Sequence, residues 1–535
     1  MVVLTVELTF HGAAGGVTGS CYRLDTGEHT VLIDCGLFQG NKSIRELNYG
    51  QFPFNARDVD AVLLTHAHVD HAGLFPKLCR AGFKGRAYAT PSTIELLGFV
   101  LPDSGHIQEL EVARLNQRNA RRGRETVTPI YTRDDAERAL KRLQAVDYEK
   151  WFEVVPGVRA RFWDAGHILG SASIEISVAQ KSGRSMRLLF SGDIGRGQLP
   201  FHPDPDAPQG FDYVVMESTY GDRLHNGGDA VARRNQLAAI IQEGLARGGN
   251  ILIPAFAVER TQELLYDLDV LFDDKVIPTL NVFLDSPLAI HVTDVFDRHL
   301  VEINEPGTPH PFRRPNLHFL DSAQDSKKLR NLAGGAIIMA GSGMCDAGRI
   351  RHHLRNNLWR PDATVILVGY QAPGTLGRLL EEGRDVVRIQ GDDVAVRAKI
   401  VKLEGYSGHA DRVGLVNWLM DRLPVCGNIF LTHGENDARA GLKAALLATG
   451  RNLPEISVPA LDAKVRLKCG KCCDWLESPS RATPAMTAPL DWHNDYAQAM
   501  IDISRTLQKL PNDAARQDFL AGIRQLITKH NPNGS

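Results

Sequence analysis

Four side chains that can bind a metal lie within six positions, in the run His66-Ala-His68-Val-Asp70-His71. They directly follow Val62–Thr65, whose apolar composition predicts a buried strand. A loop that leaves a strand end can turn these side chains toward one point, and imidazole plus carboxylate is a ligand set that suits zinc. A catalytic zinc takes three protein ligands and keeps one position open. The run therefore favours two metals over a polar loop that holds its histidines by chance.

Further ligand candidates stand in turns elsewhere in the chain. They lie in the runs Asp164-Ala-Gly-His167, Ser191-Gly-Asp193 and Leu431-Thr-His433-Gly-Glu435. Taken singly, a histidine or an aspartate beside glycine is more often a turn residue or a hydrogen-bonded core group. The residues alone therefore leave the role of each turn open.

Short apolar runs precede most of these polar residues and predict the strands that position them. Each run ends in a polar or glycine-rich turn, which is typical of buried strands whose ends carry chemistry. The residues from Leu4 to Phe10 alternate between apolar and polar types, which predicts a half-buried strand at the start. The other predicted strands are Val31–Asp34, Val59–Thr65, Arg187–Ser191, Tyr213–Glu217 and Ile429–Thr432.

Between residues 218 and 397 the pattern changes to a regular alternation of strands and helices. This alternation predicts a separate α/β domain with a parallel sheet. The predicted helices are Glu259–Phe272 and Gly348–Leu358, and the predicted strands are Asn250–Pro254, Val282–Asp285, Ala336–Ala340 and Thr364–Gly369.

The last part of the chain, from about residue 461, shows two helical patterns and no strand pattern. The helices are predicted over Asp495–Leu510 and Asn512–His530, separated by Pro511, with Asn512 as the N-cap of the second. We therefore expect a small helical extension here.

Seven motifs, in order, resemble those of the metallo-β-lactamase superfamily and of its β-CASP branch, the zinc nucleases of RNA and DNA processing. The resemblance covers about residues 1–460, and it is strongest to the bacterial and archaeal relatives of the endonuclease subunit of the cleavage and polyadenylation factor, with similar runs at 254–262 and 285–289. The first four motifs are Leu32-Ile-Asp34-Cys-Gly36, Thr65-His66-Ala-His68-Val-Asp70-His71-Ala-Gly73, His167 and Asp193. The three additional motifs are Met216-Glu217-Ser-Thr-Tyr-Gly221, Tyr406-Ser-Gly-His409-Ala-Asp411 and Thr432-His433-Gly-Glu435.

The resemblance implies an α/β fold: a metallo-β-lactamase αββα sandwich with an inserted β-CASP domain. To share a metal with Asp70, His433 must return to the first domain, so the intervening stretch is an insertion and the site lies in the cleft between the two domains. We expect the sandwich from residues 1–217 and 398–460, the inserted parallel-sheet domain from 218–397, and the helical extension from 461–535.

The resemblance also implies a ligand set for two zinc ions per chain. Asp193 would bridge the ions, and Asp34 would accept a hydrogen bond from a liganding imidazole and so fix its tautomer. His409 would protonate the leaving oxygen, and Glu217 would orient and polarise it. The first zinc would take His66, His68 and His167, and the second would take Asp70, His71 and His433.

The function that follows is a zinc-dependent ribonuclease for single-stranded RNA. A hydroxide between the two ions would attack the phosphorus in line, leaving a 5′-phosphate and a 3′-hydroxyl. Ser407, Ser342 and Arg260 are candidates for phosphate binding, because the last two stand near helix starts. Relatives often have glycine where this chain has Glu259, and an acid beside Arg260 weakens that assignment.

Three other functions compete with this interpretation. A DNA nuclease of the same branch usually has an aliphatic residue at the position of His433. A small-ester hydrolase of the glyoxalase type is much shorter and lacks His409. An inactive scaffold subunit would have lost metal ligands, whereas all seven are present. Outside the motifs, Arg114, Arg118, Arg121, Arg122 and Arg124 could guide RNA, although a solvated helix face is the simpler account.

Global composition is that of a folded protein and does not identify a partner. With 61 basic and 63 acidic residues, no overall positive field attracts nucleic acid. The absence of a spanning apolar stretch and of a basic leader predicts a cytoplasmic protein without a membrane partner. Eight irregularly spaced cysteines do not form a disulfide framework, and the single C-x-x-C in Cys469-Gly-Lys-Cys472-Cys473 is a weak signal for structural zinc. The sequence leaves open a homodimer, the choice between endo- and exonuclease action, and the RNA target.

Overall fold

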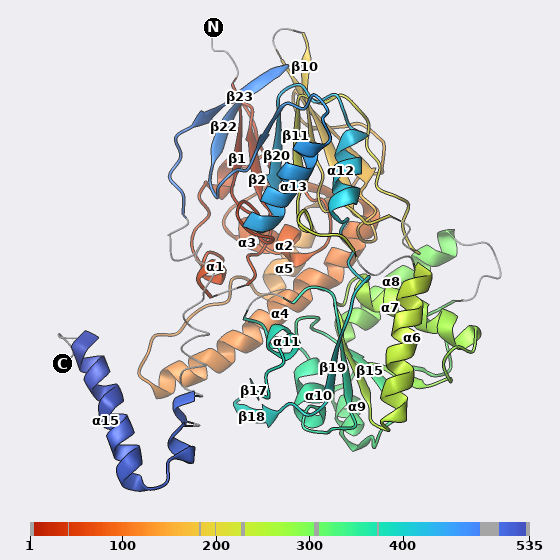
Figure 1. Cartoon of the computed structure of the whole chain (residues 1–535). Coiled ribbons are helices and arrows are strands. Elements are labelled where there is room, and N and C mark those ends of the chain that lie inside the picture. Colours follow the sequence, from red (N-terminus) through yellow and green to blue (C-terminus); the bar gives the residue numbers. More distant parts are fainter. Residues whose placement is uncertain are drawn as a thin grey trace.

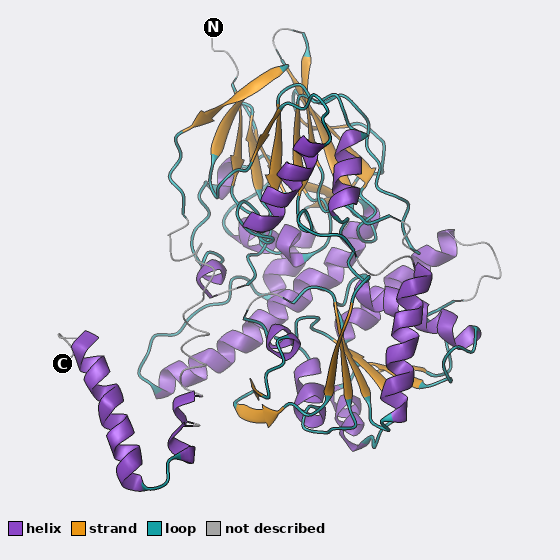
Figure 2. Cartoon of the chain, in the orientation of Figure 1, coloured by secondary structure: helices purple, strands orange, loops and turns teal. Residues whose placement is uncertain are grey.

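The computed structural model describes residues 5–40, 42–180, 183–197, 200–225, 230–303, 310–371, 374–481, 502–504 and 506–530. Figure 1 shows a strand-rich body at the top and a second body below it, whose sheet is surrounded by helices. Figure 2 shows the same division by secondary structure. Helix α15 (Asp513–His530) stands apart at the lower left of this view.

Two sheets pack face to face in the upper body. Among the described residues, the first has eight strands in the order β23-β22-β1-β2-β3-β4-β5-β6. Strands β3 to β6 run parallel to one another, and the remaining pairs are antiparallel. The strands are β1 Val6–Phe10, β2 Tyr22–Asp25, β3 Thr30–Ile33, β4 Ala61–Leu63, β5 Arg86–Ala89, β6 Leu143–Ala145, β22 Lys464–Lys468 and β23 Lys471–Leu476.

The second sheet has seven described strands in the order β21-β20-β11-β10-β9-β8-β7. Strands β10, β11, β20 and β21 are mutually parallel, and β7, β8 and β9 pair antiparallel. The strands are β7 Phe152–Val155, β8 Val158–Asp164, β9 Ala172–Ala179, β10 Ser185–Phe190, β11 Tyr213–Glu217, β20 Asn428–Thr432 and β21 Glu455–Ser457.

Apolar side chains fill three layers of this body. Between the sheets, Phe10 of the first sheet packs with Phe162 and Phe430 of the second. Helices α3 (Phe75–Arg80), α4 (Pro91–Arg121) and α5 (Arg133–Leu140) bury apolar faces against the first sheet, with Leu97 among the buried residues. Helices α12 (Arg412–Met420) and α13 (Asn436–Ala448) cover the second sheet, where Trp418 is buried. The expected αββα sandwich is confirmed.

The lower body is the inserted domain, built on a parallel sheet of six described strands in the order β14-β13-β15-β12-β16-β19. Continuous apolar runs such as Ala336–Ala340 form its centre, as expected for strands covered on both faces. The strands are β12 Ile251–Pro254, β13 Asn281–Leu284, β14 Leu317–Phe319, β15 Ala336–Ala340, β16 Thr364–Val368 and β19 Lys399–Leu403. A small hairpin pairs β17 Val386–Ile389 with β18 Asp392–Ala395.

Helices on both faces of this sheet complete the inserted domain. Helices α7 and α10 lie close to the bounds predicted from the sequence. Because β19 pairs with β16 through Leu403, the inserted sheet continues past the boundary expected at residue 397. The helices are α6 Ala230–Ala246, α7 Arg260–Asp273, α8 Pro287–Ile303, α9 Ala323–Lys328, α10 Ile350–Asn357 and α11 Leu376–Glu381. Further short helices among the described residues are α1 Lys42–Glu46, α2 Val69–Ala72, η1 Ala56–Asp58 and η2 Leu329–Asn331.

The end of the chain contains strands that the sequence did not indicate. Strand β22 pairs with β1, and β23 pairs with β22, so the first sheet is completed by residues after 461. The expectation of no strand in this part is therefore wrong: Val465 and Leu467 alternate with charged residues, and this short period-two pattern was the signal that could have indicated β22. Helix α15 matches the predicted second helix; half of the predicted first helix lies outside the described residues, and residues 502–504 and 506–509 of the other half are helical. No helix in the described ranges is long and apolar enough to cross a membrane.

Candidate metal centre

The polar residues of the candidate site sit directly after strands of the two sheets. Carboxyl ends of parallel strands meet at one edge, and this explains why residues far apart in sequence converge. Two of these residues, Asp34 and His433, have positive φ angles of 60° and 48°. Such backbone costs about 1–3 kcal/mol and persists where the surroundings fix it. Here, the backbone amide of Asp34 donates to Leu63 O at 2.9 Å and that of His433 donates to Ala13 O at 2.7 Å.

A first cluster joins three histidines with one oxygen of Asp193. His66 Nε2 lies 3.1 Å from His68 Nδ1, and His167 Nε2 lies 3.4 Å from the same atom. Both His66 Nε2 and His167 Nε2 are 3.6 Å from Asp193 Oδ2. One ligand atom from each of the four residues lies within 4.8 Å of the others, a spacing suited to one metal ion.

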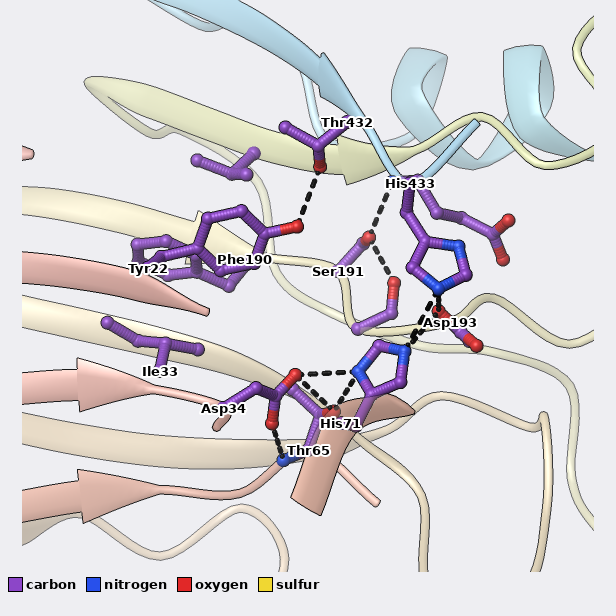
Figure 3. A pocket seen from close by; sticks show the side chains of 13 residues that line it. Tyr22, Ile33, Asp34, Thr65, His71, Phe190, Ser191, Asp193, Thr432 and His433 are labelled. Carbon is purple, nitrogen blue, oxygen red and sulfur yellow. Dashed lines mark hydrogen bonds and ion pairs between the residues drawn. The ribbon is translucent and has the colours of Figure 1, made fainter. Parts of the chain in front are cut away.

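A second cluster joins Asp70, His71 and His433. His71 Nε2 is 3.1 Å from His433 Nε2, which is 3.6 Å from Asp70 Oδ2. These ring nitrogens face the other oxygen of Asp193, since Oδ1 is 3.2 Å from His71 Nε2 and 3.6 Å from His433 Nε2. Figure 3 shows His71, His433 and Asp193 turned toward one another. The carboxylate of Asp193 thus presents one oxygen to each cluster.

Oxygen atoms behind the histidines determine which ring nitrogen carries the proton. His71 Nδ1 donates to Asp34 Oδ2 at 2.7 Å, and His433 Nδ1 donates to Thr219 Oγ1 at 3.1 Å. The Thr65 hydroxyl donates to Asp34 at 2.9 Å and accepts from His66 Nδ1 at 3.0 Å. With Nδ1 protonated, Nε2 carries a lone pair that points into the cluster. Asp34 thus lies where it can accept a hydrogen bond from His71 Nδ1.

The donor set fits divalent cations. Asp193 Oδ1 is buried, and among the described residues the only possible donors near it are the Nε2 atoms of His71 and His433, at 3.2 and 3.6 Å. Lone pairs that face each other in a buried site need a cation between them, or a proton. Burial lowers the pKa values of His66, His68 and His167, which favours the neutral imidazole that metals bind. The two clusters are therefore suited to divalent metal binding.

Neighbouring histidines keep the carboxylate of Asp193 ionised although it is buried. Burial raises the pKa of Asp193, but the imidazoles of His433, His71 and His409 outweigh it and hold that pKa well below its usual range. Burial also lowers the pKa of His71, yet the charges of Asp193 and Asp34 outweigh this and raise it well above the ordinary value. The carboxylate of Asp193 is thus ionised where a cation would need it.

His409 reaches the site from the other side. Its Nδ1 donates to Glu217 Oε1 at 3.1 Å, and its Nε2 lies 3.9 Å from Asp193 Oδ2. Burial lowers the pKa of His409, but the charges of Glu217 and Asp193 outweigh it and raise that pKa to about 9. Glu217 is itself fixed by the amides of Ile194 (2.5 Å) and Thr219 (3.2 Å). A protonated imidazole beside the metal-binding residues is placed for general acid chemistry.

The three expected phosphate contacts differ in how accessible they are. Ser407 Oγ accepts from the amide of His409 at 3.2 Å and Ser342 Oγ accepts from that of Ala347 at 3.2 Å, so each hydroxyl keeps its proton for another partner. Arg260 is only 9% exposed and pairs with Glu263 at 3.2 Å. This pairing favours a structural role for the guanidinium over phosphate binding.

Glu259 contacts the first domain rather than Arg260. Its Oε1 is 2.8 Å from His202 Nε2 and its Oε2 accepts from the amide of Leu169 at 3.3 Å. Glu259 has a φ of 69° and is buried, which is a strained backbone for a residue other than glycine. Glu259 therefore makes a contact between the domains. It does not pair with Arg260, as the expected weakening of the phosphate site would require.

Sequence reasoning missed the roles of two threonines and left two surface features undecided. Thr65 and Thr219 stood within the quoted motifs, and their position beside a ligand was the signal that could have found them. The arginine run lies exposed on the distal part of α4 and in the turn after it, as a solvated face would. Cys469 and Cys472 are free thiols, and the clusters of potential metal ligands found in the described residues contain no cysteine.

Comparison with known proteins gives three family models that match successive parts of the chain. The metallo-β-lactamase superfamily model matches residues 14–235, and the Beta-Casp domain model matches residues 261–380. A model described as the Zn-dependent metallo-hydrolase RNA specificity domain matches residues 393–458. The order of the matches agrees with a first domain that is interrupted by an insertion and then resumed.

Three curated relatives span most of the chain. Ribonuclease TTHA0252 of Thermus thermophilus is 37% identical over 83% of this chain and 96% of its own length. Transcription termination factor FttA of Methanosarcina mazei is 29% identical over 82% of this chain and 69% of its own length. Cleavage and polyadenylation specificity factor 73 of Drosophila melanogaster is 27% identical over 81% of this chain and 60% of its own length.

Proposed function

We propose that this chain, which belongs to the metallo-β-lactamase superfamily and to its β-CASP branch, is a zinc-dependent ribonuclease acting on single-stranded RNA. The family and a relative named as a ribonuclease support a hydrolytic RNA nuclease. The observation that carries the proposal is the placement of Asp193 between two histidine clusters, with His409 on a further side.

The residues would hold two zinc ions in the arrangement that the family motifs imply. His66, His68 and His167 would bind the first ion. Asp70, His71 and His433 would bind the second, and Asp193 would contribute one oxygen to each. When bound, such ions supply an activated water and positive charge that neutralises a phosphate. Asp34, Thr65 and Thr219 keep the imidazoles oriented for this task.

The remaining residues would act on the substrate itself. His409 would donate its Nε2 proton to the departing 3′-oxygen, while Glu217 holds its Nδ1 proton and so keeps the ring aimed. Ser407 and Ser342 would donate hydroxyl protons to phosphate oxygens of the strand. The products would be a 5′-phosphate and a 3′-hydroxyl. A DNA nuclease of the same branch is the alternative, and His433 argues against it.

The test is a digest of end-labelled single-stranded RNA of defined sequence, with DNA of the same sequence as the competitor. We expect the protein loaded with zinc to cut the RNA and to leave a 5′-phosphate, which phosphatase removes. Asp193→Ala, purified in parallel, is the matched control and should be inactive. Faster cleavage of the DNA, or no cleavage of either strand by the zinc-loaded protein, would overturn the proposal.

A further inference from the structure

Phe256 is an aromatic ring left in water among buried neighbours. It lies in the loop between β12 and α7 and is 37% exposed, whereas Ala255 is 1% and Val258 is 7% exposed. Single exposed apolar residues are common on protein surfaces. The surroundings of this ring, rather than its exposure alone, indicate what it does.

The loop of Phe256 lies on the side of the inserted domain that faces the metal-binding loops. Glu259, three residues further on, accepts a hydrogen bond from the amide of Leu169, which follows His167 closely in sequence. On the same edge of the sheet, Tyr370 OH donates to Glu435 Oε1 at 2.8 Å, next to His433. The carboxyl edge of the inserted sheet therefore contacts the first domain within two residues of the candidate ligands His167 and His433.

Gly343 fixes the position of the phenyl ring. A Cβ atom at residue 343 would stand 2.6 Å from Phe256 Cδ2 and 2.7 Å from Cε2, so the ring rests on a surface that only glycine leaves free. Gln371, which is 1% exposed, donates to Gly343 O at 3.1 Å and holds this turn in place. The ring thus packs against the backbone at Gly343 while the residue stays 37% exposed, and a ring held in this way has less side-chain freedom to lose on binding.

Ser342 directly precedes Gly343, the residue on which this ring rests. Its Oγ accepts from the amide of Ala347, so its own proton is free for a phosphate oxygen. An aromatic surface next to a hydroxyl donor matches the two parts of a nucleotide in a single strand, the base and its phosphate.

We propose that Phe256 is a base-stacking platform for single-stranded RNA, with the Ser342 hydroxyl bound to a phosphate of the same stretch. The proposal rests on the proposed ribonuclease function and adds a binding subsite to it. Because every base has a π face, this subsite holds the strand without selecting its sequence.

The experiment combines a protein variant with a set of RNA substrates that each lack one base. We expect Phe256→Ala to lower kcat/KM on intact RNA by about 5- to 150-fold, the worth of one stacked base. The loss should fall on KM, since stacking holds ground state and transition state alike. In the wild-type protein, one abasic position should cause a similar loss, and at that position Phe256→Ala should cause no further loss.

Two control variants separate stacking from general damage. Phe256→Trp keeps an aromatic ring and should lose less kcat/KM than Phe256→Ala does. Trp359→Ala removes a side chain that is 54% exposed just before β16, at the opposite edge of the same sheet, and should have no effect. Metal content and melting temperature of Phe256→Ala should match those of the wild type.

The outcomes distinguish this proposal from the one on which it rests. If wild-type protein cuts RNA and Phe256→Ala has the same kcat/KM, Phe256 is no stacking platform. The same conclusion follows if Phe256→Ala lowers kcat/KM by the same factor on every abasic RNA as on intact RNA. In both cases the ribonuclease function stands. If zinc-loaded wild-type protein cuts no RNA, the ribonuclease function and the subsite both fail.

Discussion

Replacing His409 by alanine tests whether the residue beside the metal-binding clusters is an acid or a ligand. The variant removes an imidazole held by Glu217 at 3.1 Å and placed 3.9 Å from Asp193 Oδ2. Neither of the two clusters described above includes His409, so both should keep their metals. We expect the cleavage rate to fall about 10²- to 10⁴-fold, the usual worth of a positioned general acid. This corresponds to about 3–5 kcal/mol of activation free energy.

The assay is single-turnover cleavage of RNA under saturating protein, with metal content measured on the same samples. A second substrate carries sulfur in place of the leaving 3′-oxygen. Sulfur departs without protonation, so it does not need the acid. On this substrate we expect His409→Ala to cut at a rate within about tenfold of the wild type, because the large loss on ordinary RNA belongs to the protonation step.

Two results would refute this reasoning. One is an equal loss of rate on both substrates, and the other is loss of a metal ion from the variant. Either result would favour His409 as a ligand or a structural residue, since Asp193, Glu217 and His409 also bring ligand atoms within 4.8 Å of one another.

Glu217→Gln provides the matched comparison. The carboxylate accepts hydrogen bonds from His409 Nδ1 and from the amides of Ile194 and Thr219. A glutamine that keeps its oxygen toward His409 turns its NH₂ group toward the Thr219 amide, and one donor loses its acceptor. A hydrogen bond to a charged group is worth about 1.5–3 kcal/mol, so we expect a smaller loss of about 10- to 100-fold in the same direction.

Four further predictions follow from the geometry of the site. Elemental analysis after gentle purification should find about two zinc ions per chain, and one ion at most, or magnesium, would defeat the two-zinc proposal. Asp193→Ala should abolish cleavage and lower the content of both ions, whereas His433→Ala should lower mainly one, and near wild-type activity in either would show that the ligand assignment is wrong. Asp34→Asn should weaken metal affinity about 10- to 100-fold by disturbing the imidazole of His71, as a metal titration would measure. In denaturant unfolding, Glu259→Ala should be less stable than Glu259→Gly by about 1–3 kcal/mol, because alanine keeps the strain at positive φ, and equal stabilities would argue against that strain.

Much of the candidate metal centre could be predicted from the sequence because the ends of buried strands can be recognised in it. A short apolar run that stops at a polar turn marks a strand, and the carboxyl ends of parallel strands meet at one edge. Asp34, His66 and Asp193 each stand at such an end, and the structure brings them together. The family motifs then supplied the partners that spacing alone left open.

Contacts between side chains across domains could not be read in the same way. Glu259 and Arg260 are neighbours in sequence, yet the structure turns Glu259 toward His202 and Arg260 toward Glu263. Glu259 has a positive φ, and the pattern of residue types in this sequence does not predict such a backbone angle or the side-chain partners that go with it. Strand β22 is a different case, since its alternation of Val465 and Leu467 with charged residues is a period-two strand pattern that covers only five residues.

The segment that carries His409 shows why the inserted domain matters to chemistry in the first domain. Three residues before it, the buried Tyr406 donates from its hydroxyl to Asp267 Oδ2 of α7 at 2.7 Å. On the other side, Gly195 pairs with His409 itself in an antiparallel bridge. The inserted domain therefore fixes one end of the segment, and the loop after Asp193 fixes the other. A misplacement of about 1 Å can cost about 10²-fold in rate, so with His409 as the proposed general acid, loss of the contact at Tyr406 would be expected to slow cleavage although Tyr406 touches no metal ligand.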